Sequence, residues 1–139
     1  MKTFFITGGC GFIGSNFIHF LFKNEHIERV INLDKLTYAG NKNNLFTIED
    51  SDCYHFIEGD ISDQQVVNGI LEKYKPDVIV NFAAESHVDR SIDNPYEFIQ
   101  TNVMGTLNLL QESKKWLMNV NSKKRESFRL IHISTDEVY

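Results

Sequence analysis

The sequence predicts an α/β fold in which a doubly wound parallel sheet carries helices on both faces. Two observations predict it. Short apolar runs alternate along the chain with segments of helical periodicity, as a parallel sheet with crossover helices requires. The first apolar run leads directly into a glycine-rich turn and an amphipathic segment, which predicts a strand, a tight turn and a helix start. A chain of 139 residues suffices for one domain with its own core.

The turn carries its glycines at Gly8, Gly11 and Gly14. Gly8 lets the chain turn sharply, Gly11 removes a Cβ that would collide with phosphates, and Gly14 lets the helix lie close to the strand. Backbone N–H groups and the positive end of the helix then face a dinucleotide pyrophosphate. The motif predicts a Rossmann-type cofactor site, although taken alone it is also compatible with a turn that binds nothing.

The first two strands are expected at residues 3–7 and 29–33. The helix between them is expected to begin near Gly11 or Phe12, and His19 falls on its polar face, which predicts a surface histidine. Its apolar face follows i, i+4 spacing and comprises Ile13, Phe17, Ile18, Leu21 and Phe22.

Asp34 ends the second predicted strand and follows Gly14 at about the 20-residue spacing at which an acid meets the adenosine ribose. A carboxylate accepts hydrogen bonds from the ribose hydroxyls and repels a 2′-phosphate. Asp34 therefore favours NAD over NADP. A solvated loop acid is the alternative.

The third and fourth strands are expected at residues 54–58 and 78–82, with a helix from about Ser62 to Tyr74 between them. Asp60 follows the third strand, where it can accept from an adenine amino group or cap the helix. Ala83 and Ala84 follow the fourth strand, where small residues allow a flat ligand to approach or simply pack closely.

A long helix is expected from Pro95 to about Trp116, with Asn94 as its N-cap. A charged loop is expected over 119–127 and a fifth strand over 128–134, in which His132 is interpreted as a packed strand residue. Thr135, Asp136 and Glu137 follow this strand. Since ligands bind at the carboxyl ends of parallel strands, these three residues are expected where substrate meets cofactor.

Composition and sequence pattern argue against several classes of protein. The net charge of −5 argues against nonspecific nucleic-acid binding, and no apolar run is long enough to span a bilayer. The beginning of the chain is too short and too soon broken by glycine for a signal peptide. Cys10 and Cys53 lack metal-site spacing, so we expect free thiols in a reducing cytoplasm and no metal site.

Five stretches together resemble one family. Thr7-Gly8-Gly9-Cys10-Gly11-Phe12-Ile13-Gly14-Ser15 resembles the fingerprint of extended short-chain dehydrogenases/reductases. Within that group, four further stretches resemble the dTDP-glucose 4,6-dehydratases: 32–41 (NLDKLTYAGN), 83–91 (AAESHVDRS), 101–106 (TNVMGT) and 134–139 (STDEVY). The resemblance spans the whole chain. Cys10 departs from it, because alanine is more common there.

The resemblance implies a redox-neutral lyase for a nucleotide-linked glucose such as dTDP-glucose. Hydride leaves C4 for NAD⁺, water is lost across C5 and C6, and the hydride returns at C6. By the same match, Asp136 protonates the departing C6 oxygen, Glu137 removes the C5 proton, and Thr135 contacts the C4 oxygen. The same match implies that His87 and Thr135 contact the substrate. Epimerases and decarboxylases of nucleotide sugars share the glycine fingerprint and remain alternatives, although the acid pair is typical of dehydratases.

The resemblance also implies which residues line the NAD site. They are Gly8, Gly11, Phe12, Ile13, Gly14, Asp34, Lys35, Leu36, Thr37, Asp60, Ile61, Ala83, Ala84, Glu85, Ser86 and Thr101.

The same family needs a Tyr-x-x-x-Lys pair on a later helix and a C-terminal substrate domain. No such pair follows Glu137. We therefore expect residues 1–139 to be an incomplete NAD-binding Rossmann domain, truncated after its fifth main strand and inactive alone, with nucleotide binding without turnover as the alternative. The family also implies a homodimer that uses the helix from Pro95, and self-association of this chain through exposed apolar surface.

Overall fold

The computed structural model describes residues 1–24, 27–86 and 94–134. Strands and helices alternate as predicted. In chain order the elements are β1 (Lys2–Thr7), α1 (Phe12–Asn24), β2 (Ile27–Asp34), the short 3₁₀ helix η1 (Lys42–Leu45), β3 (Tyr54–Glu58), α2 (Gln64–Tyr74), β4 (Val78–Asn81), α4 (Pro95–Phe98), the π-helical segment η2 (Ile99–Gly105), α5 (Thr106–Asn119), α6 (Ser122–Ser127) and β5 (Arg129–His132).

The five strands form one parallel sheet in the order β3-β2-β1-β4-β5. The order reverses between β1 and β4, because the chain adds β2 and β3 on one side of β1 and then returns to the other. This is the doubly wound, Rossmann-type sheet that the sequence predicts. Ligand sites in such sheets lie at the carboxyl ends of the strands beside that reversal.

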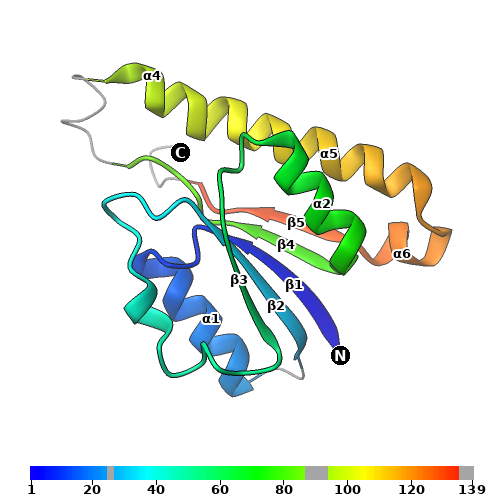
Figure 1. Ribbon diagram of the computed structural model, residues 1–139. Helices are drawn as coiled ribbons and strands as arrows, with labels where there is room; N and C mark the ends of the chain where they lie inside the picture. Colours follow the sequence, from blue (N-terminus) through cyan, green and yellow to red (C-terminus); the bar gives the residue numbers. More distant parts are fainter. Residues whose placement is uncertain (25–26, 87–93, 135–139) are drawn as a thin grey trace.

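Helices cover both faces of the sheet (Figure 1). On one face α1 and η1 pack over a core that includes Phe4, Ile6 and Ile18. On the other face α2 and α5 pack together over a core that includes Phe5 and Trp116. Successive residues of β1 thus point to opposite layers, as the period of a strand requires, and both faces of the central strand are buried.

The long helix from Pro95 is present and reaches Asn119, but it is not uniform. A π-helical segment, η2, separates α4 from α5 within one continuous rod (Figure 1). Gly105 ends this segment against Ile61, where an added Cβ would lie 2.6 Å from the Ile61 Cδ1 atom. Asn94 precedes the helix as predicted, but its side chain makes no capping hydrogen bond.

The prediction of a loop over 119–127 is wrong. Residues 122–127 form α6, because the Asn121 side chain accepts from the Lys124 N–H and caps the helix start. The fifth strand is shorter than predicted and stops at His132. His132 is exposed and not packed, since β5 lies at the edge of the described sheet, and its Nδ1 lies 3.0 Å from the Asn81 Nδ2.

The edges of the other elements differ from the prediction by a few residues. The second strand begins at Ile27, the fourth ends at Asn81, and the helix expected from Ser62 begins at Gln64. On α1, Ile13 was expected on the apolar face but is 62% exposed, because it lies in the first turn beyond the end of β1. The predicted free thiols are confirmed for Cys10 and Cys53.

Asp77 ties α6 to the start of β1, and we expect it to make stability depend on acid. Its carboxylate accepts from the Lys124 ammonium and from the Thr3 N–H. Burial raises the pKa of Asp77, but these two hydrogen bonds outweigh burial and hold its pKa below the usual 3.8. A lowered native pKa contributes stability that is present above about pH 4 and is lost as pH falls through the native value.

We therefore expect Asp77→Asn to lower the free energy of unfolding at pH 7 by about 0.5–1 kcal/mol, since the pair is partly exposed. The difference should shrink as pH falls through the lowered native pKa of Asp77, because the carboxyl group then becomes protonated in both states. Urea denaturation at several pH values measures both the loss of stability at pH 7 and its dependence on pH. Asp52→Asn, on an exposed turn, is the matched control and should leave the curve unchanged. A loss that does not diminish as the pH is lowered would contradict the ion-pair interpretation.

Candidate functional site

The candidate site lies at the carboxyl ends of β1, β2, β3 and β4. The glycine turn follows β1, residues 35–41 follow β2, residues 59–63 follow β3, and residues 82–86 follow β4. In Figure 1 the connections after β1, β2 and β4 lie together at the end of the sheet away from the N-terminus. The parallel topology thus brings four segments that are distant in sequence to one rim.

The glycine turn has the geometry that its sequence predicts. Gly8 has a φ of +68°, and a Cβ there would lie 2.6 Å from the backbone nitrogen of Ala83. A Cβ on Gly14 would overlap the Gly8 carbonyl oxygen, so this glycine lets α1 begin against the turn. At Gly11, however, the nearest atom to an added Cβ is the Gly8 oxygen at 3.4 Å, an ordinary contact. The chain itself therefore does not require glycine at position 11.

The start of α1 is open. Phe12 is 81% exposed and Ile13 is 62% exposed. The first N–H groups of a helix have no partner within it, and they carry the positive end of the helix dipole. An anionic group placed beside Gly11 would meet them. This arrangement can hold a phosphate without a basic side chain.

Asp34 fixes the turn from the end of β2. It is 7% exposed, its Oδ2 accepts from the Cys10 N–H at 2.8 Å, and its Oδ1 accepts from the Leu36 N–H at 2.8 Å. The sequence predicts a ribose acceptor here, and the structure adds a second role, because the same carboxylate links the glycine turn to the chain after β2. Each oxygen retains capacity to accept a further hydrogen bond.

The segment after β2 folds back on the turn. Leu36 adopts a φ of +54°, an uncommon conformation for a residue with a side chain. The Cys10 carbonyl accepts from the Asn41 N–H and from the Asn44 side chain, each at 3.0 Å. Thr37 closes a turn by accepting from the Gly40 N–H at 2.9 Å. These hydrogen bonds hold residues 36–44 against the glycine turn.

Lys35 and Asp60 join the ends of β2 and β3 by an ion pair of 2.8 Å. The Asp60 Oδ1 also accepts from the N–H and the hydroxyl of Ser62. Burial raises the pKa of Asp60, but the hydrogen bonds from Lys35 and Ser62 outweigh burial and lower it. The same bond raises the pKa of Lys35. Asp60 does not cap α2, because that position belongs to Asp63. Ile61 beside it is buried.

The segment after β4 is fixed by the π-helical segment. The Asn102 side chain accepts from the Glu85 N–H at 2.8 Å and donates to the Glu85 carbonyl at 2.9 Å. Thr101, its half-buried neighbour, is thereby held near this segment. Ala83 is half-buried, whereas Ala84 and Ser86 are exposed. π-helical turns in α-helices frequently occur at functional sites, because they redirect side chains.

A family model described as GDP-mannose 4,6 dehydratase matches residues 5–139. The chain belongs to this family.

Individual members of the dehydratase group are similar over the whole chain. The dTDP-glucose 4,6-dehydratase of Xanthomonas campestris pv. campestris (strain B100) is 50% identical over all 139 residues. The chain spans 39% of the length of that relative.

Among solved structures, the dTDP-glucose 4,6-dehydratase DesIV of Streptomyces venezuelae, crystallised with NAD, is 42% identical with a TM-score of 0.85. This match covers 99% of the present chain and 40% of DesIV. A UDP-glucose 4-epimerase of Thermotoga maritima is less similar, at 32% identity and a TM-score of 0.72 over 82% of the chain and 34% of the epimerase.

Not every site residue expected of this dehydratase-family chain can be located. His87, Thr135, Asp136 and Glu137 lie outside the described residues. Within the described ranges, no group of three or more His, Cys, Asp or Glu side chains is arranged to hold a metal ion. The same part of the chain contains no helix that is long and apolar enough to cross a membrane.

Sequence reasoning missed several residues that shape the site of this family member. Asn32 is fully buried beside the turn, where its Oδ1 accepts from the Gly9 N–H at 3.1 Å. Gly9 is needed for this, since a Cβ there would overlap the Asn32 side chain. Asn102 was part of a motif but not assigned a role. For Asn32, a polar residue within an otherwise apolar strand was the available signal, because a buried amide requires hydrogen-bond partners.

Proposed function

We propose that this chain forms the NAD-binding part of a dTDP-glucose 4,6-dehydratase. The observation that carries the proposal is the glycine turn, with its open helix start and the Asp34 carboxylate beside it, in a chain half identical to a curated dehydratase. The lower similarity to the epimerase supports a dehydratase over an epimerase.

The described residues fit NAD. The Gly11 position leaves space that a Cβ would fill, and the first N–H groups of the adjoining helix lack partners within it and carry its positive end. Asp34 retains acceptor capacity toward a ribose. We propose that the NAD site is lined by Gly8, Gly11, Phe12, Ile13, Gly14, Asp34, Lys35, Leu36, Thr37, Asp60, Ile61, Ala83, Ala84, Glu85, Ser86 and Thr101. When bound, NAD supplies a reversible hydride acceptor.

For catalysis we propose Thr135, Asp136 and Glu137, with His87 as a further substrate contact. C5 and C6 of the sugar are bonded to each other, so an acid for the C6 oxygen and a base for the C5 proton must approach almost the same point. Adjacent carboxyl groups satisfy this need. They must hold opposite protonation states near neutral pH, which requires different surroundings.

Two measurements test the proposal. Calorimetric titration should show that NAD⁺ binds and that NADP⁺ binds more weakly, because Asp34 repels a 2′-phosphate. Turnover of dTDP-glucose should require residues beyond Glu137. We expect the chain alone to be slower than a whole dehydratase by roughly 10²–10⁴-fold, the contribution of a general base. Absence of NAD⁺ binding would contradict the cofactor assignment, and full-rate turnover by the chain would contradict the division of roles.

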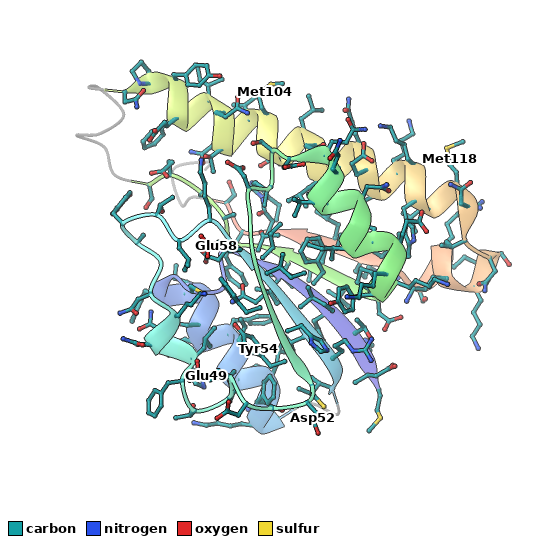
Figure 2. All side chains as sticks on the ribbon, viewed as in Figure 1. Glu49, Asp52, Tyr54, Glu58, Met104 and Met118 are labelled. Carbon is teal, nitrogen blue, oxygen red and sulfur yellow. The ribbon has the colours of Figure 1, made fainter. Side chains whose placement is uncertain are left out.

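We also propose that the outer surface of the long helical rod is a self-association face. Met104 and Met118 lie on the rod, and their exposed fractions are 46% and 71% (Figure 2). Other large apolar side chains exposed on the same rod are Tyr96, Ile99, Val103, Leu107 and Leu110. Exposed apolar surface of this extent is typical of an interface, and the homodimer implied by the family makes a second copy its partner.

We expect Leu110→Glu to shift the chain toward the monomer, since a charge would be buried in any contact between two copies. Leu110 is 49% exposed, so the substitution costs little in the folded monomer. Gln111→Glu, on the next exposed position, adds the same charge and should change nothing if it lies outside the contact. Sedimentation velocity across a concentration series measures the association of both variants and of the parent chain. A parent chain that stays monomeric at high concentration would contradict the proposal.

A further inference from the structure

A buried series of hydrogen bonds connects the glycine turn to the third strand. Asn32 on β2 and Tyr54 on β3 point to the same side of the sheet, and Tyr54 belongs to the core beneath α1. The Asn32 Nδ2 donates to the Tyr54 hydroxyl at 2.9 Å and lies 3.5 Å from the Cys10 Sγ. Figure 2 shows Tyr54 on the side of the sheet that α1 covers. Both residues are over 90% buried.

The hydrogen bonds fix how the Asn32 amide is oriented. The Gly9 N–H is a donor, so the amide oxygen must face it, and the NH₂ group then faces the Tyr54 hydroxyl. The reverse orientation would place two donors against each other. The Gly9 N–H thus sets the orientation of the amide, and the Tyr54 hydroxyl accepts from the NH₂ group and satisfies it in that orientation.

Three consecutive N–H groups of the turn are bound by three consecutive residues of β2. The Gly8 N–H donates to the Leu33 carbonyl, the Gly9 N–H to the Asn32 side chain, and the Cys10 N–H to the Asp34 carboxylate. These bonds hold the turn to the sheet along one side. The Gly11 N–H donates to the Gly8 carbonyl, and the N–H groups after it, at the start of α1, have no partner within the helix and can face an anion.

We propose that Asn32 and Tyr54 are positioning residues that hold the backbone of the glycine turn in its anion-binding shape. The effect on cofactor affinity rests on the proposed NAD function, whereas the effect on the turn does not. Neither residue is at the exposed rim, so neither touches a ligand itself. Gly9 completes the unit, because a side chain there would displace the Asn32 amide.

The groups of this unit stay uncharged at physiological pH. Burial raises the pKa of Tyr54 to about 12 and, together with the Asp34 charge, raises that of Cys10 to about 11. The charged groups that act on Tyr54 are Asp34 and Glu49, and those that act on Cys10 are Asp34 and Lys42. The effect of altering Tyr54 should therefore be the same at pH 6.5 and pH 8.5.

The experiment compares Tyr54→Phe and Asn32→Leu with Tyr74→Phe, which removes a hydroxyl from the end of α2 away from the turn. Amide exchange by NMR reports the Gly9 and Cys10 N–H groups directly, with the Ile31 amide as the reference for the sheet. Titrations with ADP and with adenosine separate pyrophosphate binding from recognition of the base and ribose.

We expect Tyr54→Phe to speed exchange at Gly9 by about tenfold relative to Ile31, and Asn32→Leu to do so more strongly, as expected for a lost buried hydrogen bond. ADP affinity should fall roughly tenfold in both, while adenosine affinity stays within about twofold, because only the pyrophosphate meets the turn. Tyr74→Phe should change none of these.

Equal exchange at Gly9 in the parent and Tyr54→Phe would overturn the inference, and so would an equal loss of ADP and adenosine affinity. If Asn32→Leu fails to fold, Tyr54→Phe still decides. A parent chain that binds neither ADP nor NAD⁺ would refute the proposed function. The exchange rate of Gly9 would then decide the positioning role by itself.

Discussion

Gly8→Ala is expected to lower the free energy of unfolding by about 3 kcal/mol or more, which is enough to unfold a marginally stable domain. Two costs add. The φ of +68° at Gly8 is unfavourable for any residue with a Cβ, and that Cβ would lie 2.6 Å from the nitrogen and 2.8 Å from the Cα of Ala83. Both contacts are with backbone, so no side-chain rotation relieves them, and the segment after β4 must move away from β1.

Gly69→Ala is the matched control, because it makes the same chemical change where nothing opposes it. Gly69 lies in α2, and an added Cβ would meet no atom within 4 Å. Alanine should stabilise the helix there by about 0.5–1 kcal/mol. Urea denaturation followed by circular dichroism measures both variants. Similar stability changes at the two positions would show that the close approach of β1 and the segment after β4 is not a constraint on the fold.

The features that the sequence predicted well are those that depend on local pattern. The apolar runs placed all five strands, and the glycine spacing located the turn and the start of α1. Asp34 was predicted at the tip of β2 because the distance along the chain from the turn is fixed by one helix and one strand.

Most of the features that were missed depend on partners distant in sequence. The bond from Asn32 to Tyr54 spans two strands, and no local pattern shows which amide faces which hydroxyl. The π-helical segment likewise reflects a distant contact, because Asn102 is bound to Glu85 and Gly105 packs on Ile61. α6 was mistaken for a loop because its charged residues lack an apolar stripe, and the Asn121 cap was not recognised.

Gly11→Ala separates binding from folding, and its largest expected effect is on the cofactor. Its Cβ would meet only the Gly8 oxygen at 3.4 Å and the Ala39 oxygen at 4.0 Å, so the free energy of unfolding should change by less than about 0.5 kcal/mol. The methyl group would instead occupy the space beside the open start of α1. We expect NAD⁺ affinity to fall by about 100-fold, which corresponds to roughly 2.8 kcal/mol of lost binding.

Cys10→Ala is the matched control for this loss, since it alters the adjacent residue and leaves the backbone in place. Cys10 contributes its N–H to Asp34 and its carbonyl to Asn41, whereas its Sγ makes only a weak contact with Asn32. Its NAD⁺ affinity should therefore remain within about threefold of the parent, because a thiol is a weak hydrogen-bond partner. If Gly11→Ala binds NAD⁺ as the parent does, the pyrophosphate does not lie at the turn, and the cofactor site must be sought elsewhere on the rim.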